Sequence, residues 1–267
     1  MGALDAIADW PVDHAAAAVV RDGDHRTAGP ADQVFDLASV TKLLSAYAAL
    51  VAVEEGTLDL DEPAGPPGST VRHLLAHASG LGFDTGVLVA PERKRIYSNT
   101  GFEALGAHVA GAAGMSFGEY VHEAVIEPLA MGASELGDRS PAHGARSSVE
   151  DLARFAGELL APTLISADTL AVATTVQFPG LDGVLPGFGA QHPNDWGLGF
   201  ELRDHKSPHW TGSTCSSATF GHFGAAGTFL WVDPDVGVAL VALTDRPFGP
   251  WAAEAWPAFA DAVLAAT

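Results

Sequence analysis

Cysteine and positive charge are both scarce in this sequence, and each shortage excludes a class of protein. Cys215 is the single cysteine, so an internal disulfide is impossible and nothing in the chain requires an oxidising compartment. Thirteen lysines and arginines stand against 33 acids, which gives a formal net charge of −20 at pH 7. A surface this negative repels phosphate backbones and anionic lipid headgroups, so we expect neither a nucleic-acid partner nor a membrane partner.

Long apolar segments and an export signal are missing as well. No apolar run approaches the roughly 20 residues that a membrane-spanning helix needs. Residues 1–11 carry Asp5 and Asp9 but no lysine or arginine, which is the wrong charge for a secretory leader. These absences predict a cytoplasmic protein. Cys215 is interpreted as a small buried apolar side chain.

What the chain does contain is an ordinary globular composition, with 48% hydrophobic and 17% charged residues over 267 positions. That length predicts one large domain or two closely joined ones. An Asp-Gly turn at residues 22–23 separates two strand-like segments and predicts an opening hairpin over residues 14–29. Apolar side chains then recur at helical spacing over residues 39–55, until Gly56 ends the first long helix.

A proline-rich acidic loop at residues 59–70 leads into a helix-rich region. Its predicted helices cover residues 71–77, 100–112, 117–126, 149–160 and 167–174. Ser148 and Ser166 are the expected N-caps of the last two. Residues 180–194 then return the chain to strand-like sequence. Four short strands and a closing helix are predicted at residues 199–203, 218–223, 228–232, 236–244 and 250–266.

These elements predict an α+β fold of the sandwich type. An antiparallel sheet would be flanked by N- and C-terminal helices and carry an inserted, mostly helical subdomain. Both ends of the chain would form the sheet domain, from residues 1–58 and 195–267. Residues 59–194 would form the insertion.

The first candidate for chemistry is the run Ser-Val-Thr-Lys at residues 39–42. It lies where a predicted strand at residues 34–37 turns into the first long helix. Ser39 would sit at the positive end of the helix dipole, with Lys42 one turn along on the same face, and that arrangement can polarise a hydroxyl group. The alternative is an N-cap serine with a solvated lysine, because Ser-x-x-Lys is common by chance.

Two further runs are ambiguous when taken alone. Tyr-Ser-Asn at residues 97–99 precedes a predicted helix, so Asn99 can be its cap. Tyr97 can act as a general base only if a neighbouring cation such as Lys42 lowers the pKa of its phenol from about 10. Gly-His-Phe-Gly-Ala-Ala-Gly at residues 221–227 indicates the close approach of another backbone or a ligand, or else a bulge at a sheet edge.

In this order the three runs resemble the motifs of the serine β-lactamase and penicillin-binding-protein superfamily. Tyr-Ser-Asn in second place is most similar to class C β-lactamases, D-alanyl-D-alanine peptidases and β-lactamase-related esterases. Residues 71–81 and the run Trp-Gly-Leu-Gly-Phe at residues 196–200 are similar to two other segments of that family. The resemblance extends over nearly the whole chain, which is short for the family.

The resemblance implies an acyl-enzyme mechanism with a role for each matched residue. Ser39 would be the nucleophile, Lys42 its proton-transfer partner and Tyr97 the general base, and either of the last two could take the proton first. Asn99 would orient Lys42 and the substrate. The backbone N–H groups of Ser39 and Ala225 would hold the oxyanion.

The third motif departs from the family pattern at two positions. His222 replaces a lysine, and Phe223 replaces a hydroxyl residue, on the strand where His222, Phe223 and Gly224 would contact the substrate. A neutral imidazole and a phenyl ring cannot hold the carboxylate of a β-lactam. The sequence therefore predicts a serine hydrolase for small esters or amides, with weak or absent β-lactamase activity and no metal or other cofactor. The alternatives are a weak β-lactamase or D-amino-acid peptidase, and a non-catalytic ligand-binding relative. The expected partner is a small-molecule ester, amide or lactam.

Two other patterns have structural interpretations. Gly-Met-Ser-Phe-Gly at residues 114–118 fits a nucleophile elbow, but Ser116 with Glu119 three positions later is typical of a capping box. His73 and His77 would share one helix face, as zinc-binding histidines do. No third ligand is evident, so both histidines are expected to be structural.

Overall fold

In the computed structural model, which describes residues 2–267, the chain forms the predicted opening hairpin. Its strands are β1 (Ala15–Arg21) and β2 (Asp24–Ala28), and the turn residues Asp22 and Gly23 both have positive φ, as a tight hairpin turn requires. β1 pairs antiparallel with β10 (Val238–Thr244), which comes from the other end of the chain. Strands from the first and last parts of the described chain thus lie side by side in one sheet.

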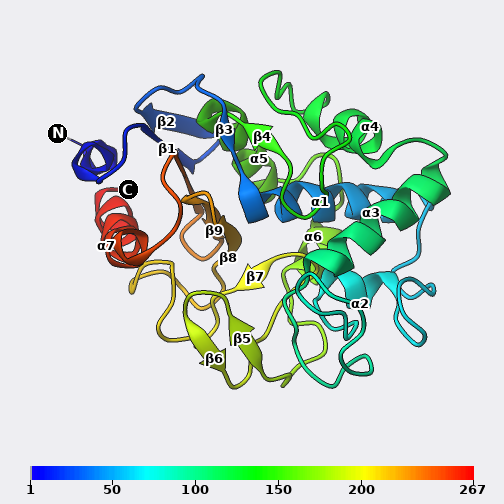
Figure 1. Cartoon of the computed structure of the whole chain (residues 1–267). Helices are drawn as coiled ribbons and strands as arrows, with labels where there is room; N and C mark the ends of the chain where they lie inside the picture. Colours follow the sequence, from blue (N-terminus) through cyan, green and yellow to red (C-terminus); the bar gives the residue numbers. More distant parts are fainter. Residues whose placement is uncertain (1) are drawn as a thin grey trace.

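The central sheet has six strands in the order β2-β1-β10-β9-β8-β7, and each neighbouring pair is antiparallel (Figure 1). Its remaining strands are β7 (Glu201–Leu202), β8 (Phe220–Gly224) and β9 (Thr228–Asp233). They fall at the predicted places, with ends that differ by one or two residues. Two small two-stranded antiparallel sheets lie outside this sheet and pair β3 (Phe35–Asp36) with β4 (Arg146–Ser147) and β5 (Gly183–Leu185) with β6 (Gly189–Gln191).

The inner strands of the sheet are buried on both faces, whereas the edge strand β2 is largely exposed. Successive side chains of a strand point to opposite faces. In β1, Ala16, Ala18 and Val20 join one apolar core, whereas Ala17 and Val19 join a second core. β9 and β10 divide their side chains between the same two cores. The sheet therefore needs a covering layer on each side.

Helices supply both layers, which confirms the predicted fold class. One core holds side chains of α1 (Thr41–Glu54) and α5 (Val149–Leu160). The other holds side chains of the closing helix α7 (Pro250–Ala266), including Trp256. A 3-10 helix at Ala3–Asp9, which the sequence analysis did not predict, packs beside α7.

The remaining helices lie in the predicted helix-rich region. They are α2 (Val71–Leu75), α3 (Asn99–Ala113), α4 (Phe117–Val121) and α6 (Ala167–Ala173). α4 is shorter than predicted because a π-helical turn replaces its second half. α5 comes from the same region but packs against β1, β9 and β10, and the boundaries at residues 59 and 194 stay a prediction. Over residues 2–267, none of the helices combines the length and the apolar character that crossing a bilayer demands.

Candidate active site

Ser39 lies in a tight 3-10 turn, Ala38–Val40, directly before α1. Ala38 has a φ of +46°, a left-handed conformation that residues with a β-carbon seldom adopt. Strained backbone of this kind persists only where surrounding contacts hold it. Here the Thr228 hydroxyl donates to the carbonyl oxygen of Leu37 at 2.8 Å. Ser39 is thereby fixed, half-buried, at the N-terminal end of α1.

Gly224, at the end of β8, allows this turn to approach the sheet. A β-carbon at residue 224 would lie 2.3 Å from the carbonyl oxygen of Leu37 and 2.5 Å from the Thr228 hydroxyl. Only glycine fits between them. The predicted close approach to the 221–227 run is confirmed, and the approaching backbone is that of the nucleophile turn.

Lys42 lies in the first turn of α1 and is fully buried. Its Nζ donates to Asn99 Oδ1 at 2.7 Å and to the carbonyl oxygen of Ala142 at 2.9 Å, and lies 4.7 Å from the centre of the Tyr97 ring. Burial lowers the pKa of Lys42 to about 7, although nearby carboxylates, Asp84 first among them, act in the opposite direction. Near neutral pH the Lys42 amine is therefore unprotonated in a large share of the molecules and is able to accept a proton.

Asn99 is the first residue of α3 and does not cap it. Ser98 is the cap, because its hydroxyl oxygen accepts a hydrogen bond from the Gly101 N–H at 2.9 Å. The interpretation of Asn99 as the cap is therefore wrong, and its side chain is free for other contacts. Asn99 Oδ1 faces Lys42, and Nδ2 donates to Asp84 Oδ1 at 2.9 Å. These two contacts fix the orientation of the amide.

Tyr97 is buried among aromatic rings, with its ring centre 5.6 Å from that of His222 and 5.8 Å from that of Trp196. Burial raises the pKa of Tyr97 above its ordinary value, although the neighbouring Ser39 hydroxyl lowers it in part. This direction is opposite to the lowered pKa that a general-base role requires. Desolvation outweighs the hydrogen bond with Ser39, and the charge of Asp84 acts in the same direction as desolvation, so Tyr97 stays a neutral phenol at pH 7.

His222 is neutral. Its Nδ1 lies 2.7 Å from the carbonyl oxygen of Phe223, and because a carbonyl can only accept, the ring proton sits on Nδ1. Burial lowers the pKa of His222 to about 3, and the charge of Lys42 acts in the same direction. Nε2 is a buried acceptor with no hydrogen-bond partner within residues 2–267. This strand therefore offers a substrate no positive charge at residue 222.

These groups meet at one cavity of about 160 Å³. The predicted site residues that line it are Ser39, Tyr97, His222, Phe223 and Ala225. The other three predicted residues lie behind its wall. Lys42 and Asn99 contact each other there, and Gly224 packs on the turn that holds Ser39.

The remaining residues that line the cavity were not predicted from the sequence. These residues are Phe83, Leu185, Pro186, Gly187, Trp196, Glu201 and Phe248. Trp196 and Glu201 could have been found, because they lie in or beside a segment that resembles the family. The others lie in loops with no recognisable pattern.

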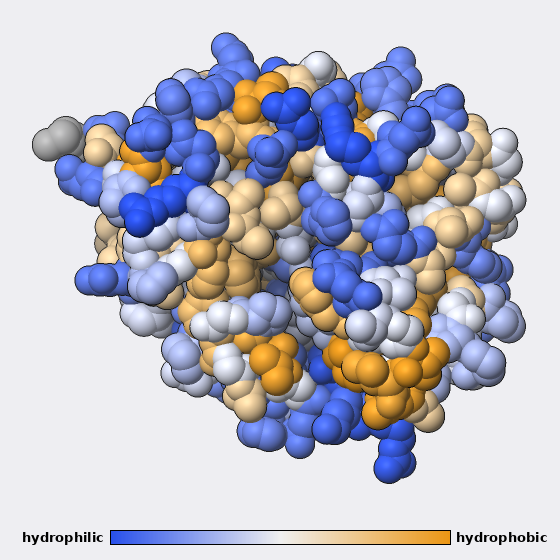
Figure 2. All heavy atoms as spheres, viewed as in Figure 1, coloured by the Kyte–Doolittle hydropathy of each residue, from blue (hydrophilic) through white to orange (hydrophobic). Residues whose placement is uncertain are grey.

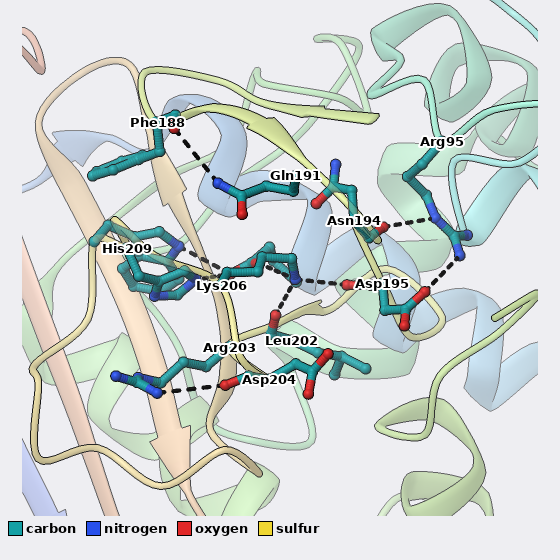
Figure 3. Close-up of polar contacts among 12 residues, drawn as sticks. Arg95, Phe188, Gln191, Asn194, Asp195, Leu202, Arg203, Asp204, Lys206 and His209 are labelled. Carbon is teal, nitrogen blue, oxygen red and sulfur yellow. Dashed lines mark hydrogen bonds and ion pairs between the residues drawn. The ribbon is translucent and has the colours of Figure 1, made fainter. Parts of the chain in front are cut away.

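Buried charges hold the wall of the cavity that contains Trp196. Lys206 Nζ donates to the carbonyl oxygen of Asp195 and to Glu201 Oε1, each at 2.7 Å, and also to the carbonyl oxygen of Leu202. Figure 3 shows the Lys206 side chain reaching between Asp195 and Leu202. The side chain of Lys206 thus connects the segments that precede and follow Trp196.

Glu201 is the centre of this network and is 2% exposed. Its Oε2 lies 2.8 Å from His209 Nε2 and accepts from Trp210 Nε1 at 3.0 Å. Burial raises the pKa of Glu201, but the charges and hydrogen bonds of His209 and Lys206 outweigh it and lower the pKa to about 2. The carboxylate is therefore ionised over the whole physiological pH range.

Arg95 braces the other side of the same wall. It donates to the carbonyl oxygens of Ala76 and Gln177, both at 2.5 Å. It also donates to the carbonyl oxygen of Asn194 at 3.1 Å (Figure 3). Nothing in the run Arg-Lys-Arg at residues 93–95 distinguishes this buried arginine from its two exposed neighbours. Its structural role was therefore missed.

The two histidines considered as a zinc pair do not share a helix face. α2 ends at Leu75, and His77 lies beyond it with a φ of +55°. His73 Nε2 contacts Glu92 Oε1 at 3.0 Å, whereas His77 Nδ1 accepts from the Ser98 N–H at 3.1 Å. Within residues 2–267, no group of three or more His, Cys, Asp or Glu side chains is placed to hold a metal ion.

Two further candidate nucleophiles are structural. Ser116 caps α4, since its hydroxyl oxygen accepts from the Glu119 N–H at 3.3 Å while Glu119 Oε2 accepts from the Ser116 N–H at 3.0 Å. α3 precedes it where a nucleophile elbow needs a strand, so the capping box is confirmed. Cys215 is buried, and burial raises its pKa to about 11.

Comparison with known proteins gives extensive matches. The family model described as Beta-lactamase matches residues 11–265. A β-lactamase from Mycobacterium bovis, known from its crystal structure, is 57% identical to this chain, with a TM-score of 0.97 over 98% of each chain.

More distant relatives share parts of the sequence or the fold. Penicillin-binding protein 4* of Bacillus subtilis (strain 168) is 26% identical over 142 residues, which are 40% of this chain and 32% of that protein. The match thus spans about a third of that relative's length. A D-stereospecific amidohydrolase from Streptomyces sp. is 21% identical, with a TM-score of 0.70 over 92% of this chain and 93% of the other, and shows a shared fold.

Proposed function

Because the chain belongs to the β-lactamase family, a family of hydrolases, we propose that it forms an acyl-enzyme on Ser39 and hydrolyses uncharged esters or amides. One observation carries this proposal: Ser39, Tyr97, His222 and Ala225 line a single cavity, and the amine of Lys42 lies directly behind it. Acylation splits one difficult hydrolysis into two easier steps.

Lys42 is the base in the proposed mechanism. Its pKa of about 7 supplies an unprotonated amine, whereas Tyr97 stays protonated. The Tyr97 hydroxyl then acts as a relay: it accepts the proton of Ser39 and gives its own proton to Lys42. Ser39 Oγ attacks the carbonyl carbon, and the leaving alcohol receives a proton by the reverse route. Water hydrolyses the resulting ester of Ser39 in the same way.

The oxyanion is assigned to the backbone N–H groups of Ser39 and Ala225, because both residues line the cavity. A donor of this kind typically contributes about 100-fold to 1,000-fold to the rate. Ser39 also lies at the N-terminal end of α1, where the helix dipole favours negative charge.

The charge of the cavity wall supports an uncharged substrate. Among residues 2–267, no lysine or arginine lines the cavity, His222 is neutral, and Lys206 already binds the carboxylate of Glu201. A substrate carboxylate would lose its hydration without gaining a partner. A second candidate, β-lactam hydrolysis, is favoured by the description of the 57% identical protein as a β-lactamase.

Reaction with a fluorophosphonate tests the nucleophile. We expect one covalent adduct, located on Ser39 by mass spectrometry of the digested protein, because the probe captures an activated serine. The Ser39→Ala variant should gain no adduct, and the matched variant Ser116→Ala should react like the wild type. A folded wild-type protein without an adduct on Ser39 would support a non-catalytic ligand-binding relative and overturn the proposal.

Two probes of similar length separate charged from uncharged substrates. We expect kcat/KM for the p-nitrophenyl ester of monomethyl succinate to exceed that for p-nitrophenyl succinate by at least about tenfold, since only the latter brings a carboxylate into the cavity. A chromogenic cephalosporin, assayed with the same preparation, should be turned over less efficiently than the uncharged ester. A kcat/KM higher for the cephalosporin by orders of magnitude would favour the second candidate.

A further inference from the structure

The catalytic cavity is closed on one side by an aromatic cluster. The ring centre of Phe223 lies 4.9 Å from that of Phe248 and 5.8 Å from that of Phe188. The turn between β5 and β6 packs tightly on these rings, because a β-carbon at Gly187 would lie 2.8 Å from the Phe248 ring. A long substituent on a substrate carbonyl therefore has no exit on this side.

A second hollow of about 590 Å³ lies next to the cavity. The cavity and the second hollow share three lining residues, Phe83, Tyr97 and Pro186. These residues form the wall between them. The apolar residues added by the second hollow include Ile96 and Val184. Of its titratable residues, Lys94, Asp182 and His192 are exposed at its surface, and the last two contact each other at 3.2 Å. The fourth, Arg95, is buried, and its guanidinium already donates to backbone carbonyl oxygens.

Exposed apolar side chains gather on the two segments that bound this second hollow. Within residues 2–267 seven large hydrophobic side chains are strongly exposed, and four of these belong to the loop at residues 81–90 and to β5. The four are Phe83 (51%), Val87 (57%), Leu88 (61%) and Val184 (59%). Figure 2 shows hydrophobic patches on both sides of a hollow in this face of the molecule. Clustered exposed apolar surface of this kind is typical of a ligand-binding groove.

We propose that the second hollow binds an unbranched aliphatic chain of the substrate, so that the enzyme prefers esters with a long apolar chain. This inference rests on the proposed function, because it places the ester carbonyl at Ser39. From there the chain is blocked by the aromatic cluster but can pass Phe83 and Pro186 into the hollow. Each methylene group removed from water strengthens binding by about threefold to fourfold. The chain can be carried by the acyl group or by the alcohol, and the two are separable by experiment.

Two ester series test the proposal kinetically. One lengthens the acyl group from p-nitrophenyl acetate to the octanoate, and the other lengthens the alcohol from methyl acetate to octyl acetate. We expect kcat/KM to rise with chain length, by about threefold for each methylene group, in the series that carries the chain into the hollow. Values that stay flat or fall in both series would overturn the proposal.

Substitution at the edge of the hollow supplies the matched comparison. Val184→Asp should reduce kcat/KM for the octyl substrate at least about tenfold more than for the shortest ester, because a carboxylate would then face the chain. Val236→Asp is the control, since Val236 is similarly exposed, at 50%, but lies in the turn between β9 and β10. Equal effects of the two substitutions on chain-length preference would contradict the inference.

A binding measurement on the Ser39→Ala variant separates this inference from the proposed function. Calorimetry with 1-octanol should show binding that Val184→Asp weakens at least about tenfold and Val236→Asp leaves unchanged. If octanol binds in this way but the wild type hydrolyses no ester, the proposed hydrolase function is refuted and the inference that the hollow binds an aliphatic chain stands. Absence of octanol binding, with short esters still hydrolysed, would refute the hollow and retain the hydrolase.

Discussion

Replacing Lys42 with methionine is expected to lower kcat/KM for an uncharged ester by about 1,000-fold or more while the protein stays folded. Lys42 is the base of the proposed mechanism, because its pKa of about 7 allows it to accept a proton at neutral pH. A correctly placed base is typically worth about 100-fold to 10,000-fold. Methionine has a similar length, so the packing against Tyr97 and Phe102 is retained. Initial rates with p-nitrophenyl butyrate measure the loss.

The same substitution should stabilise the protein at neutral and acidic pH, by about 1–2 kcal/mol, because an apolar group replaces a buried charge. The pKa of Lys42 is about 7 in the folded chain and 10.5 in the unfolded one, so the unfolded chain binds more protons between these values. Wild-type stability therefore rises with pH across this window. The advantage of the methionine variant should be largest at and below pH 7 and should shrink towards pH 10.5. Urea unfolding at several pH values measures it.

The pH profile of the wild type provides an independent measure of the same group. We expect kcat/KM to increase as the pH rises through about 7, as the amine of Lys42 loses its proton. Arg139→Met, which removes an exposed cation, is the control and should leave the profile and the rate unchanged. A rate independent of pH between 6 and 8, or a Lys42→Met variant with full activity, would contradict the assignment of Lys42 as the base.

The fold was predictable where local patterns and backbone requirements agree. The Asp-Gly turn at residues 22–23 determined the hairpin, and the serine caps at Ser148 and Ser166 marked the starts of α5 and α6. The π-helical turn after α4 and the early end of α2 were not predictable, because tertiary packing overrides a helical spacing that continues through both segments.

Only the site residues that lie within recognisable sequence motifs were predictable. Ser39, Lys42 and Tyr97 were recognised from the order of three runs, and Gly224 from glycine clustering. The direction of the Tyr97 pKa shift was not predictable, because desolvation of the phenol depends on residues far away in sequence. Phe248 could likewise not be predicted from a local pattern, since it reaches the cavity from the loop before α7.

Replacing Glu201 with glutamine is expected to lower the free energy of unfolding by about 3–5 kcal/mol. Glutamine has nearly the same shape, but it leaves the ammonium of Lys206, 5% exposed, without a countercharge. Breaking a buried ion pair by removing one partner typically costs this much, because the remaining charge is neither paired nor hydrated. Denaturant unfolding at pH 7 measures the change. Removing both charges, in Glu201→Gln with Lys206→Met, should recover a large part of the loss.

The pH dependence of this effect has a definite sign. The pKa of Glu201 is lowered from 4.5 to about 2 on folding, so its stabilising contribution is complete above pH 4.5 and is lost as the pH falls towards 2. The difference between wild type and Glu201→Gln should therefore shrink across that range. Glu135→Gln, which breaks an exposed pair with Arg139, is the control and should cost less than about 1 kcal/mol at any pH. If both glutamine variants lost equally little stability at pH 7, the Glu201 network would not be what holds the wall beside Trp196.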